Sequence, residues 1–395
     1  MDPQVQERDV TPQVWMIDPT GARRGLLTYS SLTAVERWLG VGTYRVAAPL
    51  TQQSVMAAAA GWRLAIVGGD GRPVMAGPVV EPEVSYGQDS GGRVVPTVVY
   101  AGEDDMCWLR DRAARPVPLN TLATQTEAYD VRVGQASGVI RQYVELNAGP
   151  SARPERRVPG LTLDLDSDPG AGGVVTGRAR FQSVLELCAG LADGAGIGFR
   201  VISDASATKR FQVVVPRDLR GPARFSIGLR NINMLKWRLR APKATHVVGG
   251  GRGEEEAREF IEAANEEQGL GWGRREDFFD FRSASSEDSS AELAEGTTRK
   301  LGESSATAQV QWVPVDTTAL RYGRDYGLGD LVTIDVFGGV LQVQAAIREV
   351  EHRVTRQDGY RVLPRAGDIG ASGTSLQRSI VDALTSRVSN LERTR

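Results

Sequence analysis

The chain has 395 residues, of which 41% are hydrophobic and 24% are charged, and its 47 Lys and Arg nearly balance its 49 Asp and Glu. This length exceeds the roughly 100–200 residues of one usual domain, so we expect two or three domains with their own cores. The net charge of −2 excludes the global basic field that gathers nucleic acid or anionic lipid. The 45 glycines favour many short strands joined by tight turns.

The residues able to form disulfides or hold soft metals are few: Cys107, Cys188, His246 and His352. Two cysteines cannot build a disulfide framework, and both lie among apolar neighbours, so we expect buried free thiols. None of the four has C-x-x-C or H-x-x-x-H spacing, which argues against a zinc site. The polar N-terminus lacks the features of a signal peptide, and no apolar run approaches the ~18 residues of a membrane helix. We therefore expect a protein that is made and soluble in the cytoplasm, with no membrane partner.

Residues 13–97 show short apolar or alternating runs separated by Gly/Asp turns. The Gly69-Asp70-Gly71 turn between two such runs predicts a β-hairpin. Residues 51–60 predict a short helix or a loop. This spacing of strands indicates a small antiparallel barrel or sandwich.

Residues 101–118 predict a helix with an acidic start, an arginine-rich end and a stop at Pro116. The acidic cluster Glu103, Asp104 and Asp105 could instead bind a divalent cation or supply an acid–base pair. Helix capping is favoured, because no second cluster of ligands accompanies it.

The region from 127 to 244 predicts mixed α and β structure. We expect helices at 127–147 and 178–194, a hairpin of strands at 197–203 and 210–216, and two strands within 223–239. The Arg/Pro-rich run 151–159 is predicted to be a polar surface loop. The alternating Asp164, Asp166 and Asp168 resemble the start of a calcium loop, but Pro169 and Val175 replace its required Gly and Glu, which favours a strand entering a turn.

Residues 245–268 resemble a dinucleotide fingerprint: a strand, a glycine cluster and a helix. The third glycine should lie five residues after Gly249, but that position is Glu254, and three glutamates begin the expected helix. They would repel a pyrophosphate. We therefore expect a strand, a glycine turn and a surface helix or excursion.

The last β region centres on residues 313–337, which predict a strand, a Tyr/Gly/Asp turn and a second strand. In this turn Asp330 is expected to cap backbone N–H groups rather than do chemistry. A strand at 274–281, a helix at 289–301 and a strand at 308–313 precede it. A hairpin turning at Gln357-Asp358-Gly359 follows.

The C-terminal segment from Thr374 predicts a helix whose a and d heptad positions are apolar: Val381, Leu384, Val388 and Leu391. Two heptads are too few to stand alone as a coiled coil. The helix therefore needs a neighbour, and these four residues are candidates for an oligomer interface.

Several motifs, taken in order, resemble one family. They are AGEDDMCWLRDR, VELNAGP, RFQSVLELCAGLADGAGIGF, THVVGGGRGEEEAR with WGRREDFFDFR, and YGRDYGLGDLVTI. From about Gly25 to Gly367 the chain resembles the minor tail or tail-hub proteins of actinobacterial siphophages, of the ReqiPepy type.

The resemblance implies an α+β, mainly β baseplate-hub fold, with two small antiparallel β-barrels related to the tail-tube barrel and inserted α+β domains. It implies a homotrimer at the virion tail tip whose six barrels meet a sixfold tube and adapt it to threefold symmetry. Implied partners are the distal tail protein, the tail tube, the C-terminus of the tape measure protein and downstream tip or fibre proteins. No cofactor, catalytic residue or sequence-specific nucleic-acid binding is implied.

On this resemblance the chain divides into four parts. Residues 1–125 form the first barrel, with 205–244 as a candidate to complete it, and 126–204 form an inserted α+β domain. Residues 245–370 form the second barrel with a helical excursion at 251–301. Residues 371–395 place the C-terminal helix near a threefold axis.

Two other functions remain open. A cell-wall hydrolase could use Glu103 with Asp105, or Glu276 with Asp277, as acid and base, although adjacent residues of one strand point to opposite faces. There is no G-x-S-x-G or H-E-x-x-H motif. A carbohydrate- or receptor-binding module could use the seven tryptophans, but their scattered positions favour core or interface roles. They are Trp15, Trp38, Trp62, Trp108, Trp237, Trp272 and Trp312.

Overall fold

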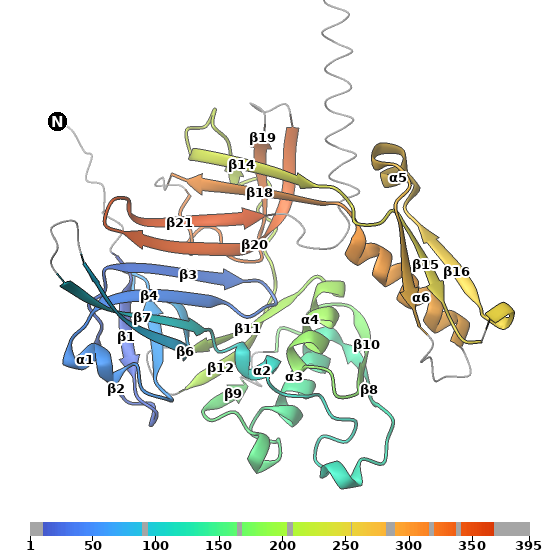
Figure 1. The fold of residues 1–395 in the computed structure, drawn as a ribbon, viewed down its shortest axis with the longest axis horizontal. Helices are drawn as coiled ribbons and strands as arrows, with labels where there is room; N and C mark the ends of the chain where they lie inside the picture. The colour runs from blue at the N-terminus through green and yellow to red at the C-terminus, as the bar shows by residue number, and fades with distance from the viewer. Residues whose placement is uncertain are drawn as a thin grey trace, which may run out of the picture. The chain divides into compact units, whose positions relative to one another are not determined.

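The structure is a computed structural model that describes residues 11–88, 94–163, 168–203, 208–253, 255–281, 289–315, 320–336 and 341–366. The fold is mainly β, as predicted, with short helices between antiparallel strands (Figure 1). It divides into two compact units: unit 1 comprises Met1–Arg217 and Glu349–Leu363, and unit 2 comprises Asp218–Arg348 and Pro364–Arg395. The predicted C-terminal helix, with Val381, Leu384, Val388 and Leu391, lies outside the described residues.

The first part of unit 1 is an antiparallel sheet with the order β3-β4-β7-β6-β5-β1-β2. Its strands are β1 (Gln13–Ile17), β2 (Arg23–Leu26), β3 (Ser31–Arg37), β4 (Thr43–Pro49), β5 (Arg63–Val67), β6 (Pro73–Gln88) and β7 (Val94–Glu103). Val14, Leu32, Val46, Leu64 and Val98, from five of these strands, share one buried core. Because every second residue of a strand faces the same side, these five residues lie together on the side of the sheet that faces the core.

Two short helices accompany this sheet. Helix α1 (Gln52–Met56) is capped by Thr51, whose hydroxyl accepts from the backbone N–H of Ser54. Helix α2 (Cys107–Arg110) follows β7. The predicted helix over 101–118 is therefore wrong for most of its length, because residues 101–103 pair with β4 as part of β7.

The second part of unit 1 is the α+β segment. It comprises β8 (Asp130–Gln135), α3 (Ala136–Asn147), β9 (Leu161–Leu163), β10 (Val174–Ala179), α4 (Val184–Gly194), β11 (Gly198–Ser203) and β12 (Lys209–Val214). Helices α3 and α4 pack on each other around a separate core that includes Ile140, Tyr143, Val184 and Cys188. The predicted hairpin β11–β12 is confirmed. Both predicted helices begin later than expected, because residues 130–135 and 174–179 pair as strands.

Unit 2 contains a group of strands with a compact aromatic core. The strands are β13 (Arg224–Phe225), β14 (Ile232–Arg240), β18 (Thr307–Pro314), β19 (Leu331–Val336), β20 (Leu341–Thr355) and β21 (Gly359–Ala366), the last two shared with unit 1. The Phe225 ring lies 5.0 Å from the rings of Trp312 and Tyr326. Of the strand–turn–strand predicted at 313–337, the turn around Tyr326 and the second strand, β19, are confirmed. β18 corresponds to the strand predicted at 308–313, and residues 316–319 of the first predicted strand lie outside the described residues.

The rest of unit 2 is a three-stranded sheet covered by a helix (Figure 1). Its elements are β15 (His246–Gly250), β16 (Phe260–Ala264), α5 (Glu266–Trp272), β17 (Glu276–Asp280) and α6 (Ser289–Ser304). Val247, Ala263, Phe279 and Leu301 form its core. The helix expected at the glutamate run is wrong: a 3-10 turn at Glu255–Ala257 leads into β16, which pairs with β15.

Candidate functional site

A buried ionic centre joins the sheet of unit 1 to its α+β segment. The Asp105 side chain is fully buried, and it accepts hydrogen bonds from Arg63 of β5, from the Ser203 hydroxyl of β11 and, at 2.9 Å, from Trp108 Nε1. Lys209 lies in the same interior and donates to the Pro159 carbonyl at 2.8 Å. Burial lowers the pKa of Lys209. Every acceptor position of Asp105 is used for structure, so the centre holds elements together rather than receiving a substrate.

The neighbouring acids do not form the suggested acid–base pair. Glu103 binds Arg110 through two contacts of 2.7 and 2.8 Å, while Asp105 is enclosed. Between them in sequence, Asp104 accepts from the Met106 N–H at 3.1 Å. Burial, aided by the charges of Asp105 and Glu36, raises the pKa of Asp104 to about 7. Asp104 thus bonds to the backbone of the loop that follows β7.

The second suggested pair, Glu276 and Asp277, is exposed on β17. Glu276 binds Arg274 at 2.5 Å, and Asp277 lies 3.7 Å from Lys300 of α6. Adjacent strand residues point to opposite faces, as predicted. The two carboxyl groups therefore cannot act on one bond.

The glycine cluster serves packing rather than phosphate binding. Gly249 and Gly250 lie within β15, where an added Cβ would meet Thr297 of α6 or the Arg258 and Phe278 side chains. Among the other suggested ligands, Asp168 accepts from the Gly170 N–H at 3.0 Å in a local turn. Asp164 and Asp166 lie outside the described residues. Within the described ranges, no group of three or more His, Cys, Asp or Glu could hold a metal ion.

The cysteines and histidines occupy interior positions. Cys107 and Cys188 are buried free thiols, as predicted, and burial raises the pKa of both. His352 is buried, with Nε2 2.6 Å from Glu36 Oε1 and Nδ1 2.7 Å from the Tyr360 hydroxyl. Such a fully bonded imidazole fixes β20 and β21 against β3 within unit 1 and leaves no free ring nitrogen for general-base chemistry.

The tryptophans do not form a sugar platform. Trp312 and Trp62 are buried in cores, the Trp38 ring packs against Gly198, and Trp108 donates to Asp105. These placements fit the predicted role as core anchors. In unit 2, Asp330 accepts from the Gly327 N–H at 2.8 Å, which confirms its predicted role in capping the turn.

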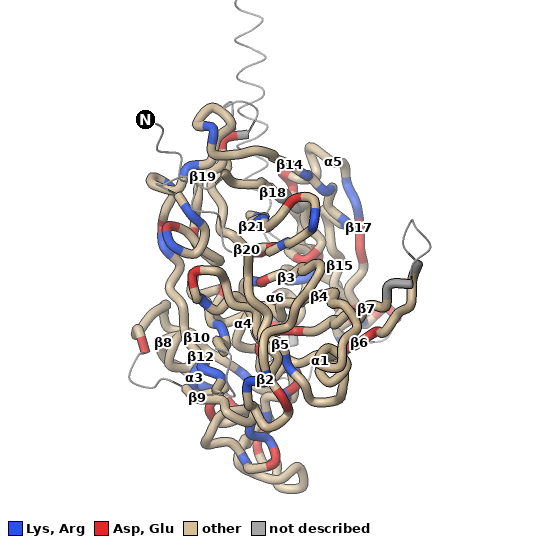
Figure 2. Tube along the Cα trace, turned by 90° about the vertical axis from the view of Figure 1, so that its left-hand side faces the viewer, with Lys and Arg blue, Asp and Glu red and all other residues tan. Residues whose placement is uncertain are grey.

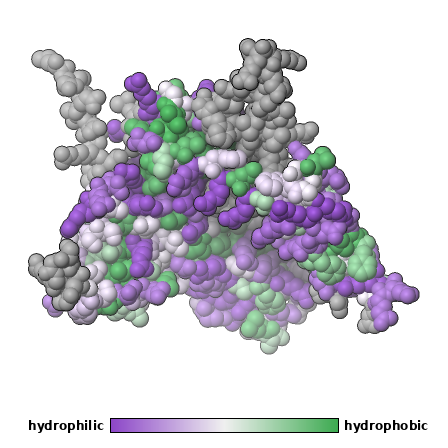
Figure 3. All heavy atoms as spheres, turned by 45° about the horizontal axis from the view of Figure 1, so that its top comes forward, coloured by the Kyte–Doolittle hydropathy of each residue, from purple (hydrophilic) through white to green (hydrophobic). Residues whose placement is uncertain are grey.

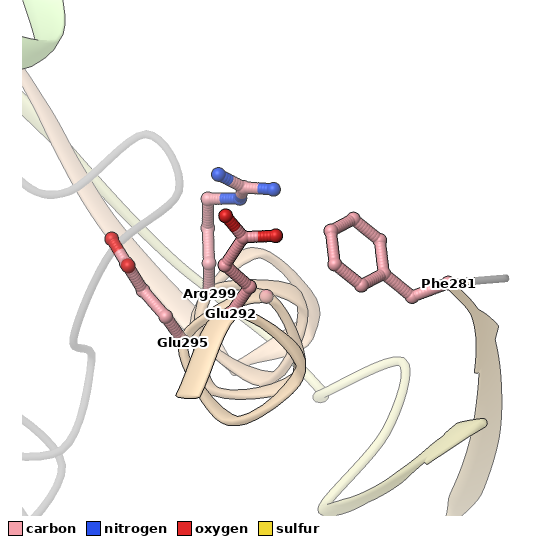
Figure 4. Close-up of a pocket in the computed structure, with 5 residues that line it drawn as sticks. Phe281, Glu292, Glu295 and Arg299 are labelled. Atoms are coloured by element: carbon pink, nitrogen blue, oxygen red, sulfur yellow. The ribbon is translucent and has the colours of Figure 1, made fainter. Parts of the chain in front are cut away.

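A shallow pocket of about 140 Å³ lies beside α6 in unit 2. Phe281 and Glu292, Glu295, Gly296 and Arg299 line it, and Figure 4 shows the Phe281 ring across from Glu292 and Arg299, with Glu295 beside them and farther from the ring. Helical spacing of three and four brings these α6 residues to one face, and Gly296 leaves the space. The lining offers two carboxylates, a guanidinium and a ring, but no hydroxyl, thiol or imidazole.

A cluster of arginines in unit 1 was missed by sequence reasoning. Arg112 and Arg115 follow α2. Arg153 and Arg156 follow α3 and lie in the run 151–159, which the sequence predicts to be a polar surface loop. Arg156 is buried, and its Nη1 donates to Asn147 Oδ1 at 3.2 Å while Nη2 donates to the Ala113 carbonyl. Burial and the charges of Arg115 and Arg112 lower the pKa of Arg156 to about 10. The density of arginines in RDRAAR and ARPERR was the available signal.

The surface as a whole carries no field of one sign. In Figure 2 the basic and acidic residues are interspersed along the trace, and in the view of Figure 3 hydrophobic residues form small patches among hydrophilic ones. Exposed apolar side chains concentrate on two ladders of unit 1: Val80, Val84 and Tyr86 on β6, and Val131, Val133 and Val174 on β8 and β10. No helix among the described residues is both long and apolar enough to cross a bilayer.

Comparisons with known proteins agree on one class. A family model described as Siphovirus ReqiPepy6 Gp37-like protein matches residues 11–368. The fold is similar to the prophage MuSo2 43 kDa tail protein from Shewanella oneidensis, with a TM-score of 0.52 and 12% identity over 90% of this chain and 98% of that one. It is also similar to the tail protein from Neisseria meningitidis MC58, with a TM-score of 0.52 and 12% identity over 91% of this chain and 98% of that one.

No curated protein sequence matches the chain. At 12% identity the two solved structures show a shared fold, whereas the family match extends over most of the sequence. The resemblance inferred from the motifs is thereby confirmed. The chain belongs to the Siphovirus ReqiPepy6 Gp37-like protein family.

Proposed function

We propose that this chain is a structural protein of the siphophage tail that assembles as a homotrimeric hub at the tail tip. The observation that carries the proposal is the full-length likeness to a phage tail protein, over 90% of this chain and 98% of that one. The likeness therefore extends over both units of this chain and is not confined to one of them.

The two units fit the two barrels that such a hub requires. The curved sheet β1–β7 of unit 1 would be the first barrel, and the group β13, β14 and β18–β21 the second, with the α+β segment and the β15–α6 segment as insertions. Three copies would then present six barrel-like units to a sixfold tube and leave a threefold face for the parts beyond it. The proposed neighbours are the distal tail protein, the tail tube, the tape measure C-terminus and tip or fibre proteins.

We propose a non-enzymatic role. Glu103 and Glu276 are bound to arginines, and Asp105 is enclosed, so neither of the two carboxylate pairs suggested by the sequence faces a common cleft. The exposed apolar ladders on β6 and on β8–β10 favour assembly, because exposed patches of this kind mark contacts with other proteins.

The test is the mass of the purified chain in solution, followed by mixing with purified tail components. Light scattering after size-exclusion chromatography is expected to give three times the 42.6 kDa chain mass, or a monomer that joins the tail assembly. A stable monomer that also fails to join tail components would refute the proposal.

A further inference from the structure

The arginine cluster of unit 1, defined as Arg112, Arg115, Arg153 and Arg156, is built by two loops that bond to each other. Arg112 Nε donates to the Arg156 carbonyl at 2.8 Å, and Arg156 donates in return to the Ala113 carbonyl. Arg153 Nη1 donates to the Leu119 carbonyl at 3.2 Å. Backbone carbonyls thus orient the guanidinium groups of Arg112 and Arg156 without neutralising their charge, whereas Arg153 also pairs with a carboxylate.

The carboxylates closest in sequence to these arginines already have partners. Glu155 binds Arg153 at 2.5 Å, Asp111 binds Arg110 at 2.8 Å, and Glu145 accepts from the Ser151 N–H at 2.8 Å. Within the part of the chain that the structure describes, Arg112, Arg115 and Arg156 form no ion pair with a carboxylate. The charges of Arg112 and Arg115 lie close to the buried guanidinium of Arg156 and repel it, and an incoming anion relieves that repulsion.

The ligand chemistry follows from the arginines. A planar guanidinium presents paired N–H donors that match carboxylate or phosphate oxygens, and it binds them most strongly where water is partly excluded. The chain has a net charge of −2 and no wide basic face, whereas nucleic-acid binding draws on many spread phosphate contacts. A compact acidic tip of a protein therefore fits the cluster better than a polynucleotide.

This chain carries such a tip in unit 2, at the turn between β15 and β16. Glu255 and Glu256 are exposed, and neither forms an ion pair with another described residue. Hydrogen bonds hold the two sides of the tip: the Gly251 N–H donates to the Glu259 carbonyl at 2.9 Å, and Arg258 donates to the Gly250 carbonyl at 3.1 Å and to Asp280 at 2.6 Å. Groups on a segment held in this way lose less conformational entropy on binding.

We propose that the arginine cluster of one copy receives the acidic tip, Glu255 and Glu256, of a second copy. This inference rests on the self-association proposed above and names a contact for it. The two surfaces differ, so the contact is head-to-tail, and head-to-tail contacts close into rings when the rotation between copies allows. A threefold ring would use the contact three times.

Disulfide trapping tests the contact directly. Arg153→Cys and Glu256→Cys chains are purified separately and mixed under mild oxidation, and the native Cys107 and Cys188 are buried and stay unreactive. We expect a cross-linked band of two chains in this mixture and a much weaker band when Glu266→Cys, another exposed glutamate of unit 2, replaces Glu256→Cys. Equal bands in both mixtures, or none, overturn the inference. So does a disulfide that forms only within a single chain carrying both Arg153→Cys and Glu256→Cys.

Charge reversal separates this inference from the proposed function. Glu255→Lys with Glu256→Lys, at an exposed tip, is expected to weaken self-association by about tenfold or more, and Arg153→Glu is expected to do the same. Combining the reversals should restore association. If the wild type assembles and every variant assembles equally well, this inference fails while the hub proposal stands, and a wild type that neither self-associates nor joins tail components removes both. Binding of a DNA oligonucleotide lost in Arg153→Glu, with association unchanged, would assign the cluster to phosphate instead and overturn the contact.

Discussion

At the scale of single residues, the ionic centre around Asp105 explains how unit 1 is held together. A fully buried carboxylate is tolerated because Arg63, Ser203 and Trp108 all donate to it. Removing one partner of such a pair leaves the other charged and buried, which costs far more than the net stabilisation that the pair provides.

Asp105→Asn is therefore expected to lower the free energy of unfolding by about 3–5 kcal/mol, because Arg63 loses its counter-charge. Denaturant unfolding followed by tryptophan fluorescence measures the change. Asp111→Asn is the matched control, since it breaks an exposed pair with Arg110 worth about 0–1 kcal/mol. A combined Arg63→Met and Asp105→Leu variant should be more stable than Asp105→Asn. Equal losses in Asp105→Asn and Asp111→Asn would contradict this account.

Asp104 gives unit 1 a stability that depends on pH. Its pKa is raised from 3.8 to about 7 in the fold, so the folded chain holds this proton more tightly than the unfolded chain does. The stabilising contribution is complete below about pH 4 and is lost as the pH rises through about 7.

Asp104→Asn removes that dependence. It is expected to raise the free energy of unfolding by about 1–2 kcal/mol at pH 8, relative to the wild type, and to leave it nearly unchanged at pH 4. Thermal unfolding across this pH range measures the difference, and Glu186→Gln, on the exposed face of α4, should shift nothing. A difference between Asp104→Asn and wild type that is the same at both pH values would show that Asp104 is not the titrating group.

Residue roles were predictable from the sequence only where they are local. The Asp330 turn was predicted because Gly327, its hydrogen-bond partner, lies three positions away. The roles of Asp105 and Arg156 were not, since their partners Arg63, Ser203 and Asn147 lie 42, 98 and 9 positions away. A single sequence does not show which distant groups meet, so it predicts a helix end at Arg112 and Arg115 and a surface loop at Arg153 and Arg156 rather than one cluster.

At the scale of elements, strands with a strong turn signal were predicted well, and helices next to strands were not. The hairpins at Gly69–Gly71 and Gln357–Gly359 are present because their turns need glycine, and Gly71 and Gly359 have φ of 82° and 67°. The acidic residues 103–105 are typical of the first turn of a helix, and for this reason the sequence predicts a helix there. Pairing of Glu103 with Thr43 in the sheet overrode it, as tertiary pairing overrides local propensity.

Gly102 of β7 is predicted to be sensitive to substitution, because the neighbouring strands pack closely on it. A Cβ there would lie 2.1 Å from the Tyr44 ring and 2.5 Å from the Pro78 carbonyl, whereas a Cβ at Gly87 of β6 would meet nothing within 4 Å. Gly102→Ala is expected to lower the free energy of unfolding by about 1–3 kcal/mol, and Gly87→Ala by less than about 0.5 kcal/mol. Chemical denaturation compares them, and equal effects would show that the strands are not so closely packed.

At the scale of the whole molecule, the mainly β fold and the family were both accessible from the sequence. Motif order identified the family because YGRDYGLGDLVTI and its companions keep their sequence order along the whole chain. Assembly was not accessible in the same way, because a single chain does not distinguish an interface patch such as Val131, Val133 and Val174 from any other exposed strand. The head-to-tail arginine contact and the hub role are accordingly both statements about assembly.

The most direct test of the central claim is an electron cryo-microscopy reconstruction of intact phage tails that carry this chain, with an antibody or tag marking it. We expect the marker on a threefold-symmetric ring at the tip, joined on one side to the sixfold tube, with one copy of the chain per threefold unit. A marker distributed along the tube, or a sixfold ring at the tip built from this chain, would contradict the account.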